Sequence, residues 1–159
     1  MPHPRPIAAV DRGAIADFLR QRWGTGTIML DGRAIDAAGL PGFVAMDAGA
    51  VVALATLLDG PDLCEIVTLD AMPPGAGLGS RLIELAAERA RALGHALLLA
   101  RTTNDNLDAL RFYQRRGFRL HALATGAIDR EREADPKVPL IGRHGIPLRD
   151  EISLIRPLA

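Results

Sequence analysis

The stretch from residue 63 to residue 93 constrains this chain most, because it combines a strand, a glycine-rich turn and a helix in direct succession. An apolar run over residues 63–69 predicts the strand. Gly75, Gly77 and Gly79 follow, and apolar residues then recur at helical spacing. The first turn of a helix leaves backbone N–H groups unbonded, and glycines let an anion approach them closely. We therefore expect this turn to hold a phosphate-bearing ligand.

Two common phosphate-binding motifs do not fit this turn. A P-loop needs lysine and then serine or threonine after the glycines, whereas Arg81 and Leu82 follow Ser80 here. A dinucleotide fingerprint needs glycine or alanine three residues after Gly77, where this chain has Ser80, and strand-like runs without a helix precede the turn. An NADP-binding protein stays open as an alternative, because Arg101 ends the next strand, where a 2′-phosphate could be met.

Two motifs of this chain occur together in one known family. Residues 74–79 (PGAGLG) follow a strand, and residues 106–118 begin with Asn106, carry Tyr113 and end in Gly-Phe. They resemble the acetyl-CoA loop (Gln/Arg-x-x-Gly-x-Gly/Ala) and the Asn-x-x-Ala-x-x-x-Tyr-x-x-x-Gly-Phe pattern of the GNAT superfamily of N-acetyltransferases, although Pro74 replaces the first Gln/Arg. The resemblance covers about residues 43–124.

The resemblance implies an α+β (mixed α/β) fold: a GNAT-like mixed, largely antiparallel central sheet of six to seven strands with helices on both faces. Local patterns predict strands over residues 27–30, 42–47, 50–59, 63–71, 96–100, 118–124 and 151–155. Besides the helix after the glycines, one helix is predicted from Asp11 to about Trp23, and another from Asn104 or Asp105 to Gly117. Residues 31–41 are predicted to form a loop. Trp23 is predicted to pack on the core, and contact with an acceptor is the alternative.

Composition limits the class of protein. With 159 residues, we expect a single domain over residues 1–159. The balance of 19 basic and 19 acidic residues gives no electrostatic case for a nucleic-acid or membrane partner. No apolar run approaches the roughly 20 residues that cross a bilayer. The first residues lack a signal-peptide pattern and Cys64 is the single cysteine, so we expect a cytoplasmic protein.

The resemblance also implies how the co-substrate acetyl-CoA is held. The pantetheine arm would pair, like an extra strand, with the backbone of Val67, Thr68 and Leu69. The pyrophosphate would lie on backbone N–H groups of six residues: Gly75, Ala76, Gly77, Leu78, Gly79 and Ser80. Asn106 would bond the carrier's amides or cap its helix.

Glu65 is the best candidate for the base that deprotonates an amine, because it is ionisable and interrupts an apolar strand. Glutamate at a comparable position is the base in some members of the superfamily, and burial would raise its pKa. Strand alternation leaves open that Glu65 faces solvent or a salt bridge; Asp70 and His121 are weaker candidates. The resemblance implies that Tyr113 protonates the leaving thiolate, and the alternative is a tyrosine packed under the sheet.

These residues predict an acetyl-CoA-dependent N-acetyltransferase. The acetyl group would pass to a primary amine of a small molecule or peptide by direct attack in a ternary complex, with Cys64 as a core residue. The four histidines lack ligand spacing, so no metal site is expected. An alternative from another class is a catalytically degenerate module that binds an acyl-CoA for regulation.

Residues 125–150 are too long for a simple hairpin between two strands, which needs two to five residues. In the superfamily this connection often lines the acceptor side of the cleft. We therefore expect a partly ordered flap with a short charged helix near residues 128–133. A surface excursion and a homodimer contact are the alternatives.

Overall fold

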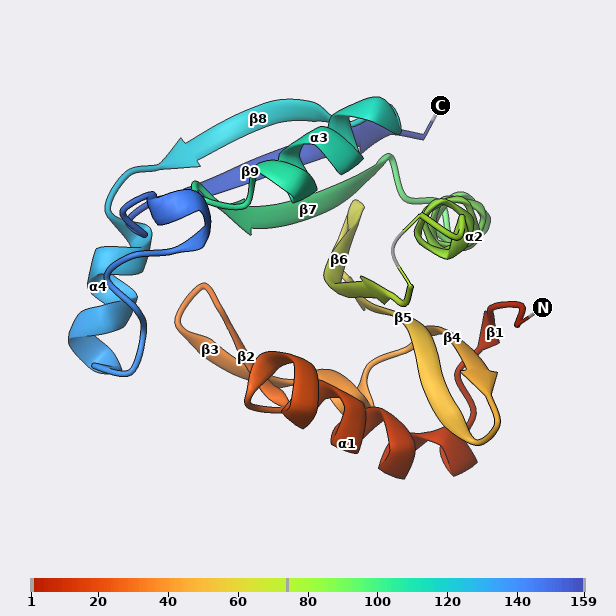
Figure 1. The fold of residues 1–159 in the computed structure, drawn as a ribbon. Helices are drawn as coiled ribbons and strands as arrows, with labels where there is room; N and C mark the ends of the chain where they lie inside the picture. The colour runs from red at the N-terminus through yellow and green to blue at the C-terminus, as the bar shows by residue number, and fades with distance from the viewer. Residues whose placement is uncertain (1, 74, 159) are drawn as a thin grey trace.

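The computed structural model describes residues 2–73 and 75–158, and its centre is one mixed sheet (Figure 1). In spatial order its strands are β1 (Arg5–Pro6), β4 (Gly42–Asp47), β5 (Ala50–Asp59), β6 (Leu63–Ala71), β7 (Leu97–Thr103), β9 (Glu151–Pro157) and β8 (Arg119–Ala124). Neighbouring strands pair antiparallel, except for the parallel pair β6 and β7. The predicted mixed, largely antiparallel sheet of six to seven strands is confirmed.

Helices cover both faces of this sheet (Figure 1). The α-helices are α1 (Arg12–Trp23), α2 (Leu78–Ala92), α3 (Leu107–Arg115) and α4 (Ala127–Ala134). Short 3₁₀ turns occupy Ala9–Asp11, Ala37–Gly39 and Arg143–Gly145. On one face, α1 packs Ile15 and Leu19 against Leu54 of β5. On the other face, α2 and α3 pack their apolar sides onto β4–β7, which forms the larger core.

The parallel pairing of β6 and β7 ends part-way along both strands. It runs from Leu63 opposite Leu97 to Ile66 opposite Ala100. At that point β6 has a bulge, because β5 pairs with Ile66 and then with Thr68, which leaves Val67 without an opposite residue. A bulge bends its strand. From here β6 stays with β5 while β7 continues alongside β9, so the two halves of the sheet separate.

Residues 31–41 are more ordered than the sequence analysis predicted. The strands β2 (Thr27–Leu30) and β3 (Arg33–Asp36) form a separate two-stranded hairpin. Its turn, Asp31-Gly32, has left-handed φ values of 51° and 77°. Asp-Gly is a frequent two-residue hairpin turn. The prediction of a loop was therefore wrong, although the signal for a hairpin was present.

One further prediction about local structure needs correction. The expectation that Asn106 caps its helix is confirmed, because its side chain accepts a hydrogen bond from the backbone N–H of Ala109, whereas neither Asn104 nor Asp105 caps α3. The last strand, β9, lies between β7 and β8, which leaves β8 at the edge of the sheet. The predicted short charged helix of residues 125–150 is present as α4.

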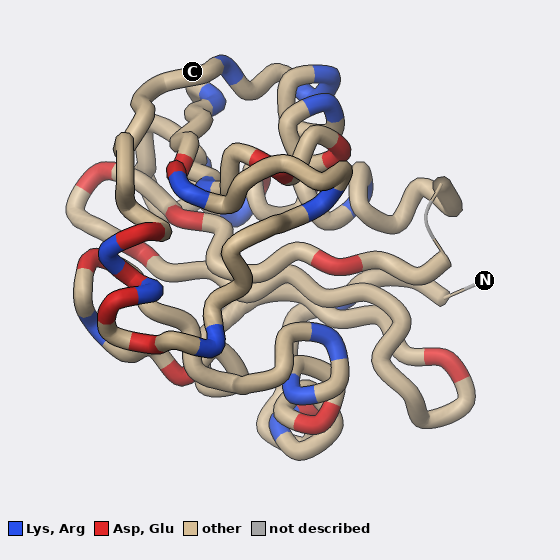
Figure 2. The backbone as a smooth tube through the Cα atoms, turned by 60° about the vertical axis from the view of Figure 1, so that its left-hand side comes forward, with Lys and Arg blue, Asp and Glu red and all other residues tan. Residues whose placement is uncertain are grey.

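Charges of both signs are interspersed along the chain, as Figure 2 shows for the backbone positions of Lys, Arg, Asp and Glu. Within residues 2–73 and 75–158, none of the helices is long and apolar enough to cross a membrane.

Candidate active site

Two cavities of about 410 Å³ each lie where β6 and β7 separate. The two cavities adjoin, because five of their lining residues are shared: Arg22, Leu69, Asp70, Ala109 and Tyr113. One, the loop-side cavity, also touches the glycine turn, α3 and Arg116. The other, the hairpin-side cavity, also touches the β2–β3 hairpin, Glu65 and Arg101.

The glycine turn forms one wall of the loop-side cavity. Gly75 and Gly77 have φ values of 85° and 83°, in the left-handed region that favours glycine, and Gly77 is the N-cap residue of α2. Ser80 also lines this wall. Leu78 is buried in the core, so it offers only its backbone, and Ala76 is not among the lining residues. Pro74 lies outside the described residues.

Arg116 is a lining residue that the sequence analysis missed. Its guanidinium stacks on the ring of Phe112, 3.7 Å from the centroid, and its Nε donates to Ser80 Oγ at 2.8 Å. A Cβ on Gly79 would lie only 3.0 Å from the same ring, so glycine allows this packing. Among the described residues no carboxylate pairs with Arg116, and its charge is therefore available to an anion beside the turn.

Tyr113 lies at the junction of the two cavities. It is buried, and its ring packs edge-on against Phe112 and Phe118, with centroids 5.4 and 5.0 Å away. Within the described part of the chain its hydroxyl has no hydrogen-bond partner. Burial, and then the charge of Asp70, raise the pKa of this hydroxyl, which keeps it protonated at neutral pH.

Glu65 is buried in the wall of the hairpin-side cavity, with 6% of the residue exposed. The interpretation that it faces open solvent is therefore excluded, but the salt bridge is present: Arg101 Nε lies 3.1 Å from Glu65 Oε2. Burial raises the pKa of Glu65, and the nearby charge of Arg101 opposes that effect. A carboxylate with a raised pKa suits proton transfer near neutrality.

Asp70 and Trp23 meet at the other side of the cavities. The indole Nε1 of Trp23 donates to Asp70 Oδ2 at 2.7 Å, and Arg22 pairs with the same carboxylate at 3.2 Å. Trp23 is 44% exposed and lines the hairpin-side cavity, so the prediction that it packs on the core was wrong. Its place at the end of α1 brings the indole to Asp70 instead.

Comparison with known proteins agrees with this geometry. Residues 13–118 match the model of the acetyltransferase (GNAT) family. The Bacillus subtilis (strain 168) protein YxbD is 33% identical over 154 residues, which cover 96% of this chain and 97% of that protein. The chain belongs to the GNAT acetyltransferase family.

Two solved structures show the same fold at low identity. A Bacillus subtilis acetyltransferase in complex with CoA has a TM-score of 0.72 and 19% identity, with 100% of both chains covered. A GNAT family acetyltransferase from Elizabethkingia anophelis with bound acetyl-CoA has a TM-score of 0.68 and 19% identity, covering 98% of this chain and 97% of that one.

Within this GNAT domain, most of the predicted site residues lie together. Those that line one or both cavities are Glu65, Val67, Leu69, Gly75, Gly77, Gly79, Ser80, Asn106 and Tyr113. Thr68 lines neither, because it is buried and its hydroxyl is hydrogen-bonded to Thr56 at 2.7 Å. His121 is exposed on β8 and lines neither cavity. Cys64 is buried in the core, and burial raises the pKa of its thiol to about 12.

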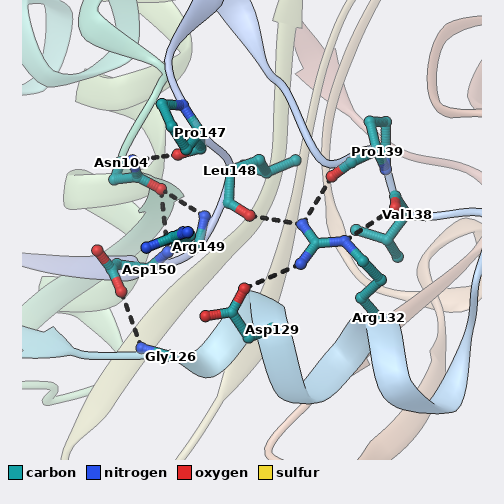
Figure 3. Close-up of polar contacts among 10 residues, drawn as sticks. All are labelled: Asn104, Gly126, Asp129, Arg132, Val138, Pro139, Pro147, Leu148, Arg149 and Asp150. Carbon is teal, nitrogen blue, oxygen red and sulfur yellow. Dashed lines mark hydrogen bonds and ion pairs between the residues drawn. The ribbon is translucent and has the colours of Figure 1, made fainter.

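The segment of residues 125–150 also reaches the hairpin-side cavity, through Ile128, Glu131 and Arg143. Figure 3 shows what orders it. The guanidinium of Arg132 lies 2.9 Å from a carboxylate oxygen of Asp129, and it donates to three backbone carbonyls: Val138 at 3.1 Å, Pro139 at 2.7 Å and Leu148 at 2.5 Å.

Asn104 ties this segment to the end of β7 (Figure 3). Its side chain donates to the carbonyl of Pro147 at 2.9 Å and accepts from the backbone N–H groups of Arg149 and Asp150, each at 3.0 Å. Beside it, the buried Asp105 accepts from the N–H of Arg143 at 2.8 Å. Asn104 and Asp105, which the sequence analysis placed at the start of α3, therefore anchor the segment that borders the hairpin-side cavity.

Proposed function

We propose that this protein transfers an acetyl group from acetyl-CoA to a primary amine by direct attack in a ternary complex. One observation carries the proposal: the separation of β6 and β7 opens two adjoining cavities that bring the glycine turn, Tyr113 and Glu65 to one site. Membership of the GNAT acetyltransferase family supports it.

The loop-side cavity has the features that a CoA carrier needs. Backbone groups at the N-terminus of α2 favour an anion, the left-handed glycines keep the approach open, and Arg116 adds a positive charge without a carboxylate partner among the described residues. Beyond Ile66, β6 has no β7 neighbour, so the backbone around Val67 and Leu69 is open to a strand-like pantetheine arm. When bound, acetyl-CoA supplies an activated acetyl thioester.

Glu65 in the hairpin-side cavity and Tyr113 at the junction of the two cavities are positioned for the two proton transfers. Glu65 takes a proton from the attacking amine as the new N–C bond forms. Tyr113 gives its proton to the departing sulfur as the C–S bond breaks, which its raised pKa allows because the hydroxyl is protonated beforehand. An acyl-enzyme on Cys64 is disfavoured, since that thiol is buried and stays protonated.

The acceptor would enter through the hairpin-side cavity, between the β2–β3 hairpin and the segment of residues 125–150. Both small-molecule and peptide amines fit this proposal. The NADP alternative loses its main argument, because Arg101 is surrounded by the carboxylates of Asp31, Glu65 and Glu151, which would repel a phosphate.

A panel of primary amines, assayed for acetyl-CoA-dependent thiol release, tests the proposal. We expect turnover with at least one amine, and loss of most of that turnover in the Glu65→Gln variant. Calorimetry with acetyl-CoA and with NADPH runs in parallel. Tight acetyl-CoA binding without thiol release from any amine would favour the regulatory module, and absence of acetyl-CoA binding would overturn the proposal.

A further inference from the structure

Arg101 lies at the point where β6 and β7 separate, and it faces carboxylates from three different elements. It donates to both carboxylate oxygens of Asp31, in the turn of the β2–β3 hairpin, at 2.8 and 3.1 Å. Its Nε lies 3.1 Å from Glu65 on β6, and its Nη1 lies 3.7 Å from Glu151 on β9. The proton transfers described above do not by themselves require this arrangement.

Among the described residues, β2 and β3 pair with each other and not with the main sheet, so strand pairing does not hold the hairpin in place. Ile28, Met29 and Leu30 of β2 line the hairpin-side cavity. The packing of Ile28 against the apolar cluster around α1 holds the hairpin to the rest of the protein, and the bond from the N–H of Ala37 to the carbonyl of Gly26 only closes its two ends on each other. Near its tip, the ion pair between Asp31 and Arg101 connects it to β7.

We propose that Arg101 is a positioning residue, which fixes the tip of the β2–β3 hairpin and the carboxylate of Glu65 relative to each other at the hairpin-side cavity. The inference rests on the proposed function, in which Glu65 is the base. Arg101 touches neither the amine nor the thioester in this account, and it acts through Glu65 and through the hairpin.

The charges around Glu65 allow the effect of Arg101 on the pKa of Glu65 to be measured separately from its effect on the position of the hairpin. Arg101 faces it from β7, Asp31 from the hairpin and Glu151 from β9; Glu131 of α4 lies near Glu151 and raises the pKa of that residue. Arg101 is the positive charge that lowers the pKa of Glu65, while Asp31 and Glu151 raise it. Removal of Arg101 and removal of the Asp31 charge must therefore shift the titration of Glu65 in opposite directions.

The experiment measures the pH profile of kcat/KM with an amine that the parent enzyme acetylates. Deprotonated Glu65 is the active form, so activity falls as the pH drops below its pKa. In Arg101→Gln this acid limb should move to higher pH by about 1 unit, the low end of the effect of an opposite charge at this distance. In Asp31→Asn it should move to lower pH.

The hairpin gives the second readout. Asp31→Asn should raise KM for the amine by up to about fivefold, the equivalent of a partly exposed ion pair, and leave the acetyl-CoA Kd unchanged. Arg101→Lys keeps the positive charge but cannot donate to both carboxylate oxygens of Asp31 as the planar guanidinium does. Its acid limb should therefore stay near that of the parent, while KM for the amine rises. Arg33→Gln, at an exposed arginine of the same hairpin, is the matched control and should change neither quantity.

Acid limbs that move in the same direction in Arg101→Gln and Asp31→Asn, or that do not move, would overturn the proposal. If Arg101→Gln does not fold, as read by circular dichroism, Arg101→Lys and Asp31→Asn still decide it. An acid limb that survives in Glu65→Gln belongs to another group and overturns the inference while acetyl transfer itself stands. A parent enzyme that acetylates no amine contradicts the proposed function instead.

Discussion

The hydroxyl of Tyr113 is the single atom group on which the proposed departure of the thiolate depends. Tyr113→Phe removes it and keeps the ring contacts with Phe112 and Phe118. We expect kcat to fall by about 10²–10⁴-fold, the usual worth of a general acid, with little change in the acetyl-CoA Kd measured by calorimetry. Unaltered turnover would mean that water or another group protonates the thiolate.

A substitution at Gly77 tests whether the backbone of the glycine turn binds the phosphates of acetyl-CoA. It has a φ of 83°, and a Cβ there would meet no atom within 4 Å, so the protein interior does not exclude a side chain. Gly77→Val strains the turn and places a side chain where an anion would approach, and acetyl-CoA binding should weaken sharply. The circular dichroism spectrum should change little. Gly79 is a poorer choice, because a side chain there would press on Phe112.

A substitution at Arg116 tests whether a positive charge beside the glycine turn contributes to acetyl-CoA binding. Arg116→Gln should raise the acetyl-CoA Kd by about tenfold, in line with one charge-assisted hydrogen bond to a phosphate. The effect should shrink at high salt, because screening weakens what the charge contributes. Arg115→Gln, the exposed neighbour on α3, is the matched control and should bind acetyl-CoA like the parent. Equal acetyl-CoA Kd values for the parent, Arg116→Gln and Arg115→Gln would show that Arg116 does not contribute to acetyl-CoA binding.

At the scale of elements, residues 125–150 form an ordered segment whose polar contacts centre on Arg132. Arg132→Gln removes the charge from these contacts and should loosen the segment. Because Ile128, Glu131 and Arg143 border the hairpin-side cavity, we expect KM for the amine to rise about tenfold while acetyl-CoA affinity holds.

Arg130→Gln in the same helix is the control, since Arg130 is exposed and, among the described residues, donates only to the carbonyl of Thr125, at 3.2 Å. A change in mass by light scattering in Arg132→Gln would instead point to the homodimer contact. If neither KM nor mass changes, the segment has no role at the acceptor site.

Local sequence signals located most elements, because helices and strands with one buried face have a clear period. They missed β3, where four residues with little apolar pattern form a strand only because Asp31-Gly32 turns the chain back on β2. They left the cap of α3 undecided: Asn104, Asp105 and Asn106 are all plausible caps by residue type, and only the tertiary contacts with residues 143–150 separate them.

In the whole molecule, the glycine turn and the Tyr113 motif could be placed at one site in advance, because each is a continuous motif and the resemblance to the GNAT superfamily implies that both lie at the acetyl-CoA. The neighbours of Glu65 could not. These neighbours come from three elements far apart in the chain: Arg101, Asp31 and Glu151. They meet because β9 lies beside β7 in the sheet and because the separate β2–β3 hairpin reaches Arg101. Arg116 was missed for the same reason, since its contact with Ser80 joins α2 to the end of α3.

The proposed reaction is a direct transfer of the acetyl group between two substrates that are bound together where β6 and β7 separate. Initial rates with the cognate amine, measured while both acetyl-CoA and amine concentrations vary, test it most directly. We predict double-reciprocal lines that intersect, as a ternary complex requires, both in the parent and in Cys64→Ala. Parallel lines, the pattern of a covalent acyl-enzyme, would exclude direct transfer in a ternary complex.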